Sequence, residues 1–240
     1  MGFDPGRRST LTRHDLGRFP GSSLFERVAR VVCEAECLPR KELYESWEIA
    51  RRTRRRFRGG RVVDLACGHA LVAQLMLILD DTSRSALAVD TRLAPSAAKL
   101  TDALAVAWPR IAGRIELVET PLAAVVLTRE DVVVSTHACG ALTDVVLARA
   151  VDARARVAVL PCCHDDTTCD PGGLSGWLDI SLAIDATRAA RLRGSGYRVF
   201  TQIIPEAITE KNRLLLGEPE PPAHASRSGP AAPADHGPRR

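Results

Sequence analysis

The fold of this chain is decided by one stretch of sequence, Val62-Val63-Asp64-Leu65-Ala66-Cys67-Gly68-His69-Ala70. It begins as a short apolar run typical of a buried strand, and a helical pattern starts directly after it. The glycine between the two permits a tight turn and lets a ligand approach the backbone closely. Because open α/β sheets bind ligands beside such a turn, we expect Asp64, Ala66, Cys67 and Gly68 to contact a ligand.

Strand and helix patterns alternate from this stretch onward. Strands are predicted at 61–66, 85–90, 114–118, 131–135, 156–160, 197–204 and 213–217. Helices are predicted at 69–79, 95–107, 141–150 and 180–194, and a shorter piece lies at 121–126. Continuous apolar strands joined by helices indicate a parallel sheet buried on both faces. The last two strands are joined by a loop without a helix, which predicts a terminal hairpin whose final strand is antiparallel. We therefore expect a doubly wound α/β sheet of seven strands.

Three regions follow from this pattern. Residues 61–217 form the α/β domain, and residues 1–60 form an N-terminal helical extension whose first twenty residues are expected to be loosely ordered. The segment 218–240 holds six prolines and no Leu, Ile, Val or Phe. Such a segment buries too little apolar surface to offset its ordering entropy, which predicts a disordered tail.

The N-terminal extension is predicted to hold two helices, separated at Pro39, and the second ends in a dense run of arginines. These are Arg51, Arg52, Arg54, Arg55, Arg56 and Arg58, and Gly59-Gly60 follow them. One interpretation is a solvated helix face. The other is an electrostatic site for phosphate or RNA, since clustered arginines attract a phosphate backbone.

Composition excludes several classes of protein. The 240 residues are 45% hydrophobic and 26% charged, with a net charge of +4, which is ordinary for a globular chain. Apolar runs stay short of the roughly 18 residues that a membrane span requires, and the first residues lack the pattern of a secretory signal. We expect a cytoplasmic protein with no membrane partner, whose seven cysteines are free thiols, metal ligands or active-site residues.

Acidic residues stand at the ends of the first three predicted strands: Asp64, Asp90 and Glu119. The acid that ends the second strand is placed to bind ribose hydroxyls, and Glu119 would lie near an adenine. The turn has one glycine where a dinucleotide fingerprint has G-x-G-x-x-G. A cofactor without a pyrophosphate, such as S-adenosylmethionine, therefore fits better than NAD.

The fourth and fifth predicted strands end in histidines and cysteines. The two segments are Ser135-Thr136-His137-Ala138-Cys139-Gly140 and Leu160-Pro161-Cys162-Cys163-His164-Asp165. Parallel strands place these segments at the same edge of the sheet as the cofactor turn. They are expected to meet where a substrate would approach the methyl group.

Four motifs occur in this order: Asp-Leu-Ala-Cys-Gly-His, His-Ala-Cys-Gly-x-x-Thr-Asp, Pro-Cys-Cys-His and Ile-Thr-Glu-Lys-Asn-Arg-Leu-Leu-Leu-Gly. Over about residues 61–217 the chain resembles a branch of the S-adenosylmethionine-dependent methyltransferases. That branch, with a Rossmann-like methyltransferase fold, includes the eukaryotic tRNA acceptor-stem 2′-O-ribose methyltransferases. The resemblance implies that Asp64, Cys67 and Gly68 line the methionine end of the cofactor and that Asp90 binds its ribose. It also places the following residues at the reaction centre: His137, Cys139, Asp144, Cys162 and His164.

A hydroxyl acceptor needs a base, and a histidine with a pKa of about 6.5 suits this role. We expect His137 or His164 to accept the proton, with Asp144 orienting that histidine or the substrate, and Lys211 as a third candidate. A zinc site made of Cys162, Cys163, His164 and Cys169 was considered, because thiolates and imidazole suit zinc. Adjacent cysteines and the missing C-x₂-C spacing argue against it, so no metal is expected.

Besides a zinc-dependent structural module, which bound metal would reveal, three functions remain open at this point. The first is a methyltransferase that acts on RNA, for example on a ribose hydroxyl of tRNA. The N-terminal zinc-finger segments of the tRNA enzymes have no counterpart in this sequence. The second is a small-molecule methyltransferase that uses the N-terminal helices as a lid. The third is a non-catalytic partner protein that binds S-adenosylmethionine.

Overall fold

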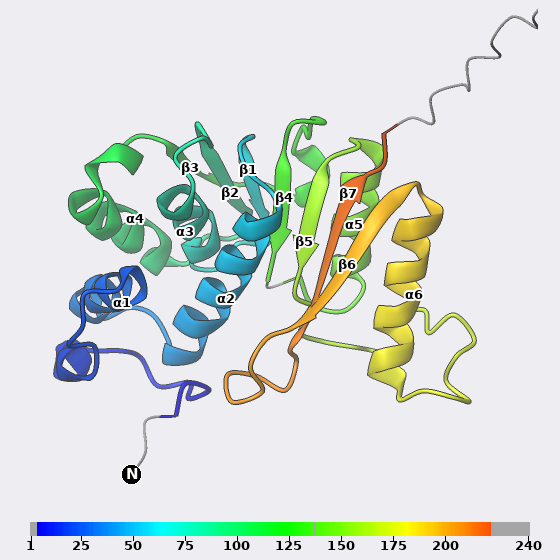
Figure 1. The fold of residues 1–240 in the computed structure, drawn as a ribbon, viewed down its shortest axis with the longest axis horizontal. Helices are drawn as coiled ribbons and strands as arrows, with labels where there is room; N and C mark the ends of the chain where they lie inside the picture. The colour runs from blue at the N-terminus through cyan, green and yellow to red at the C-terminus, as the bar shows by residue number, and fades with distance from the viewer. Residues whose placement is uncertain (1–3, 137, 222–240) are drawn as a thin grey trace, which may run out of the picture.

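A seven-stranded sheet runs through the middle of the protein in the computed structural model, which describes residues 4–136 and 138–221 (Figure 1). The strands are β1 (Val62–Leu65), β2 (Ala86–Asp90), β3 (Ile115–Glu119), β4 (Val132–Ser135), β5 (Arg156–Val159), β6 (Tyr197–Ile203) and β7 (Arg213–Pro219). Their order across the sheet is β3-β2-β1-β4-β5-β7-β6, and β7 is antiparallel to both its neighbours. The first five strands pair in parallel. The doubly wound sheet and the antiparallel final strand are confirmed.

Six α-helices accompany the strands in the described part of the chain. They are α1 (Leu24–Ala35), α2 (Arg40–Arg56), α3 (Leu71–Leu79), α4 (Pro95–Ala107), α5 (Leu142–Asp152) and α6 (Ile180–Gly194). Short 3₁₀ turns lie at η1 (Arg13–Arg18), η2 (Pro109–Ile111) and η3 (Leu122–Ala124). Helix α3 begins two residues later than predicted, because Ala70 adopts a left-handed conformation and belongs to the turn. No helix among these residues is long and apolar enough to cross a membrane.

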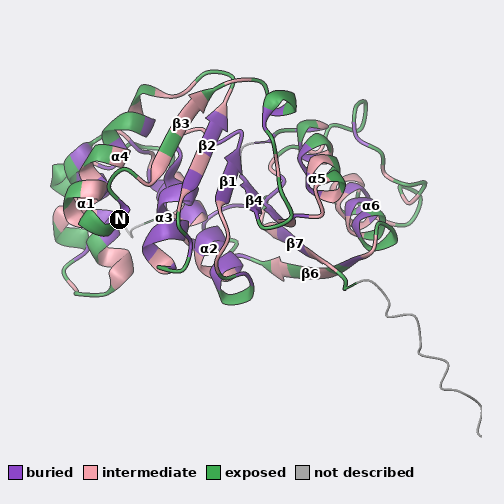
Figure 2. Cartoon of the chain, turned by 90° about the horizontal axis from the view of Figure 1, so that it is seen from above, coloured by how far each residue is buried: buried purple, intermediate pink, exposed green. Residues whose placement is uncertain are grey.

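Two apolar cores lie on opposite faces of the sheet (Figures 1 and 2). Side chains alternate between them along each strand: Val62 and Val132 belong to the core shared with α1–α4. Val63 and Val133 belong to the core shared with α5 and α6. The N-terminal helices therefore pack into the same core as the sheet. A domain boundary at residue 60 stays a prediction.

The segment before α1 is well packed, so the expectation of a loosely ordered start is wrong for residues 4–20. Leu11 and Phe19 are buried in the first core. The backbone N–H of Leu11 donates to the carbonyl of Leu38 at 2.9 Å, and Thr10 forms a bridge with Pro39. Two large apolar residues spaced along a polar segment are enough to hold it against the helices.

Most arginines in the run at the end of α2 form ion pairs with carboxylates of the same chain. Arg51 and Arg52 pair with Glu48, Arg54 and Arg58 with Asp80, and Arg56 with Glu218. The side chain of Arg54 is only 2% exposed, and Arg56 also stacks on the ring of Phe200. Five of the six arginines thus form ion pairs within the chain, while Arg55, Arg56 and Arg58 remain exposed. The solvated face therefore describes much of the run, and Arg54 is its buried exception.

Strand β7 continues to Pro219, beyond the residue at which the sequence pattern ended it. Glu218, which was assigned to the disordered tail, pairs with Arg56 and Arg198. The predicted boundary of the tail at residue 218 is therefore too early. The end of β7 has little apolar surface, but ion pairs hold it in the sheet. Residues 222–240 lie outside the described part of the chain.

Candidate active site

The carboxyl ends of β1, β4 and β5 meet at one edge of the sheet, since these three strands are neighbours and run in parallel. Strand β1 lies between β2 and β4, so the strand order reverses at this point. In open α/β sheets a crevice forms where the order reverses, and it is the usual place for a ligand. The loops after these strands carry the histidines and cysteines that the sequence analysis singled out.

The turn after β1 has an unusual backbone. Ala66, Gly68 and Ala70 all have positive φ angles, of 53°, 55° and 57°. The left-handed conformation costs an alanine about 1–2 kcal/mol, so this turn stores backbone strain. Such strain is concentrated at ligand-binding sites. The N–H of Gly68 donates to Asp90 Oδ2 at 3.1 Å, which brings the predicted ribose-binding acid against the turn.

Asp64 lies beneath this turn and is buried, with 1% of its surface exposed. Its Oδ2 accepts a hydrogen bond from the N–H of Ala73 at 3.2 Å, in the first turn of α3. Burial raises the pKa of Asp64 well above its usual range, and the nearby Asp90 carboxylate adds to the rise. The other oxygen, Oδ1, is buried without a hydrogen-bond partner among the described residues. A ligand with a donor group could satisfy it.

Two further side chains border the turn. Glu119, at the end of β3, accepts a hydrogen bond from the N–H of Leu93 at 2.9 Å. His69 pairs through Nε2 with Glu42 of α2 at 3.0 Å, and its Nδ1 contacts Ser96 of α4. The sequence analysis missed the contact with Glu42, because helical periodicity shows which face of α2 is buried but not its neighbour.

The structure separates the two described residues that were predicted to act together in catalysis. Asp144 accepts hydrogen bonds from Arg188 Nε at 3.0 Å and Nη2 at 2.8 Å. His164 Nε2 lies 2.8 Å from Asp185 Oδ1, and its Nδ1 is buried without a partner among the described residues. Asp144 therefore does not contact His164 directly, since Arg188 donates to its carboxylate and Asp185 takes the imidazole. That Asp144 orients the substrate stays a prediction. His137 lies outside the described residues.

Asp185 is the acid that contacts His164, and it also accepts from Arg213 at 2.7 Å. Burial would raise the pKa of Asp185, but hydrogen bonds from His164 and Arg213 hold it below its usual value. The pattern around residues 180–194 indicated only a helix. The spacing does not show which polar residues of this helix would face the fifth strand.

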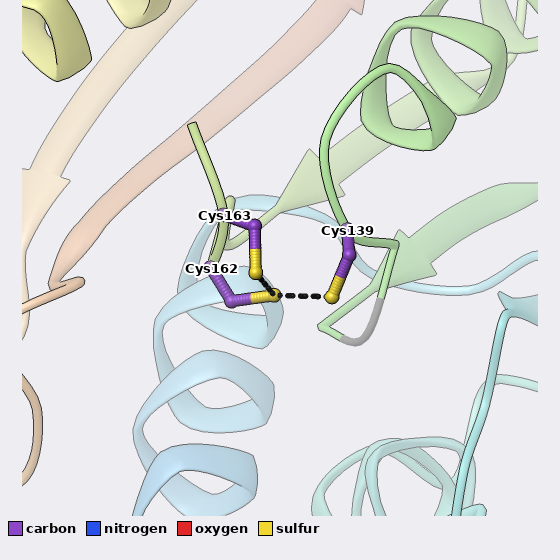
Figure 3. Close-up of side chains that lie close together, drawn as sticks. All are labelled: Cys139, Cys162 and Cys163. Carbon is purple, nitrogen blue, oxygen red and sulfur yellow. Dashed lines mark hydrogen bonds between the residues drawn. The ribbon is translucent and has the colours of Figure 1, made fainter. Parts of the chain in front are cut away.

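Three cysteines from two loops lie together at the ends of β4 and β5 (Figure 3). The Sγ atoms of Cys139 and Cys162 are 3.0 Å apart, and those of Cys162 and Cys163 are 3.7 Å apart. The four residues considered for zinc do not come together as a set. His164 is held by Asp185, and Cys169 is buried with its Sγ 3.5 Å from Arg188 Nη2.

A cavity of about 390 Å³ opens beside these cysteines. Its walls come from the N-terminal segment and the start of α2, the ends of β4 and β5, and the loop between β6 and β7. The lining residues are Arg8, Pro39, Lys41, Glu42, Glu45, Thr136, Leu160, Cys162, Cys163 and Lys211. Lys211, the third candidate base, is therefore at this cavity, and the contribution of α2 had no counterpart in the motif analysis.

A family model described as a methyltransferase domain matches residues 41–169, which is more than half of the chain. The chain belongs to this methyltransferase family. It is an S-adenosylmethionine-dependent methyltransferase, and S-adenosylmethionine is its methyl donor. The Rossmann-like methyltransferase fold expected from the sequence is confirmed.

No curated protein sequence matches the methyltransferase. Among solved structures, the pyocyanin biosynthetic protein PhzM is 16% identical, with a TM-score of 0.51 over 88% of this chain and 62% of that one. A proposed O-methyltransferase from Nostoc punctiforme is 14% identical, with a TM-score of 0.50 over 85% and 67%. The m1A22 tRNA methyltransferase TrmK from B. subtilis is 15% identical, with a TM-score of 0.49 over 72% and 66%. At these identities the likeness is one of fold.

Proposed function

We propose that the methyltransferase methylates a small molecule that binds in the cavity at the ends of β4 and β5. The observation that carries the proposal is the position of this cavity at the ends of β4 and β5, where Glu42 in its wall pairs with His69 of the turn after β1. Its volume of about 390 Å³ lies within the range of roughly 300–1,000 Å³ found for small-molecule pockets. The start of α2 forms one wall, so the N-terminal helices act as the cover expected of a small-molecule enzyme.

The methyl donor is proposed to occupy the turn and the ends of β1–β3. Its sulfonium supplies an already activated methyl group, so the protein's main task is orientation. Two observations support the fit: the unpaired buried oxygen of Asp64 and the Asp90 carboxylate held against Gly68. Asp64, Ala66, Cys67 and Gly68 would border the methionine end. Asp90 would bind the ribose, and Glu119 would lie toward the adenine.

The charges in the cavity suit a polar acceptor. Lys41 Nζ pairs with Glu45 Oε1 at 2.9 Å, so the charges of these two side chains cancel in this part of the wall. Lys211 also lines the cavity and would bind an anionic or proton-bearing group. Among the described residues that were considered as the base, Lys211 is at the cavity, and His164 is not among its lining residues.

RNA is the second candidate acceptor, and the motif resemblance to tRNA ribose methyltransferases favours it. An RNA site draws much of its affinity from lysines and arginines that contact phosphates. In the arginine run of α2, five of six members already pair with carboxylates of the same chain, which reduces the free positive charge that this run offers to a phosphate. The geometry therefore favours a small acceptor.

Methyl-labelled S-adenosylmethionine separates the two acceptors. We would incubate the protein with the label and either a deproteinised small-molecule cell extract or purified total tRNA, at low and at high salt. The expected result is label in the small-molecule fraction with little dependence on salt. Label that enters tRNA, is released by ribonuclease and declines steeply with salt would contradict the proposal. The Asp90→Ala variant is the control, because any label that it still transfers at the parent's level does not depend on the proposed cofactor site.

A further inference from the structure

The thiols of Cys139, Cys162 and Cys163 point toward one another from two loops that are 23 residues apart in sequence (Figure 3). All three Sγ atoms lie within 4.8 Å of one another. Two thiolates on one tetrahedral zinc ion are about 3.8 Å apart, given a Zn–S distance of about 2.3 Å. The cluster therefore already has nearly the dimensions of a three-thiolate metal site.

The adjacent cysteines do not prevent this arrangement. Adjacency argued against zinc because neighbouring side chains usually diverge. Here the Sγ atoms of Cys162 and Cys163 are 3.7 Å apart and lie on the same side of the loop. Cys139, from the loop after β4, takes the place that the sequence analysis had given to His164 or Cys169.

The loops that carry the cysteines are anchored on both sides of the cluster. The hydroxyl of Thr143 donates to the carbonyl of Ala138 at 2.6 Å, and Arg188 donates to the carbonyl of Gly140 at 2.9 Å. These two carbonyls flank Cys139. His164, which follows Cys163, is held by Asp185. A metal would thus find its ligands largely pre-positioned, with little ordering entropy left to lose on binding.

We propose that Cys139, Cys162 and Cys163 bind a zinc ion as three thiolates. Thiolates select soft ions, and zinc accepts them in a tetrahedral site without redox chemistry. The three thiols release their protons to solvent on binding, and no electrons are exchanged. The ion's positive charge offsets the repulsion among three neighbouring thiolates.

The fourth ligand position lies on the side of the cavity, because Cys162 and Cys163 line it. Zinc ions with three protein ligands keep this position for water or for a substrate atom. Here it would take water or a soft donor atom, such as the sulfur of a thiol, from a molecule in the cavity. The assignment to a bound acceptor rests on the proposed function, whereas the three-thiolate site itself does not.

Metal analysis of the full chain tests the site. Protein purified with added zinc and without chelators is expected to hold one zinc per chain. Cys139→Ser, Cys162→Ser and Cys163→Ser should each weaken zinc binding by about tenfold or more. Cys37→Ser and Cys169→Ser, which remove thiols outside the cluster, should keep full zinc content. Failure of the intact, reduced chain to bind zinc, or full zinc content in the triple serine variant, would overturn the proposal.

Cobalt substitution tests the ligands without any variant. Cobalt in this site is expected to give thiolate-to-metal charge-transfer bands and the intense visible bands of a tetrahedral ion. Addition of 2-mercaptoethanol should change the visible bands, because a thiol can enter the fourth position. An octahedral spectrum would exclude the three-thiolate site, and unchanged bands would exclude the open position. These readouts are independent of methyl transfer, so the site and the proposed function can fail separately.

Discussion

Arg54→Ala is expected to lower the free energy of unfolding by about 3–5 kcal/mol, the usual cost of removing one partner from a buried ion pair. Arg54 Nη1 lies 3.1 Å from Asp80 Oδ2, and both side chains are at most 2% exposed. Its other nitrogens donate to the carbonyl of Met76 at 2.9 Å and to Ser83 Oγ at 2.7 Å. Burial lowers the pKa of Arg54 to about 10, and the nearby Asp80 carboxylate acts in the opposite direction, favouring the charged guanidinium.

The neighbouring Arg55→Ala variant is the matched control for this experiment. Arg55 is exposed, and exposed substitutions usually change stability by less than about 0.5 kcal/mol. Urea unfolding of the two variants and the parent protein measures the difference. A loss of less than about 1 kcal/mol for Arg54→Ala would mean that water reaches this pair and that the arginine run is more open than the contacts indicate.

Asp90→Ala is expected to weaken the binding of S-adenosylmethionine by about 10- to 100-fold. This range corresponds to the 1.5–3 kcal/mol that a hydrogen bond to a charged group contributes. Calorimetric titration measures the change, and the parent protein should bind S-adenosylmethionine but not NAD. The affinity of the Asp90→Asn variant should fall between those of the parent and the Asp90→Ala variant, since asparagine keeps an acceptor for the Gly68 N–H and loses the charge.

Asp81→Ala controls for the general loss of an acidic residue. Asp81 is exposed and precedes β2, whereas Asp90 ends that strand. Equal affinities in the Asp90→Ala variant and the parent would remove Asp90 from the cofactor site. The thermal stability of each variant should be measured in the same preparation, because the Asp90 carboxylate also holds the turn.

The sequence predicts the sheet and its helices well, for reasons visible in particular elements. Helix α4 was predicted at 95–107 and runs over Pro95–Ala107, because Pro95 suits a first helical position and Pro109 follows its end. The antiparallel β7 was predicted from a connection too short to hold a helix. Such signals are local, so spacing along the chain is enough to read them.

The site was less predictable, because its contacts join segments that are far apart in sequence. Nothing in the run Arg51 to Arg58 indicates that Arg54 would be buried against Asp80. Spacing could not show that Asp144 pairs with Arg188, or that Asp185 contacts His164. The strand ends indicated where Cys139 and Cys162 would lie, but only side-chain directions show that their sulfurs meet.

The two ends of α2 have different roles. Its first turns line the cavity with Lys41 and Glu45, and its last turn is locked into the core through Arg54. If the cavity binds the methyl acceptor as proposed, substitutions near the first turns would alter which acceptor fits, while the anchored end keeps the protein folded. A lineage of such enzymes could change its substrate along one helix without having to rebuild the sheet.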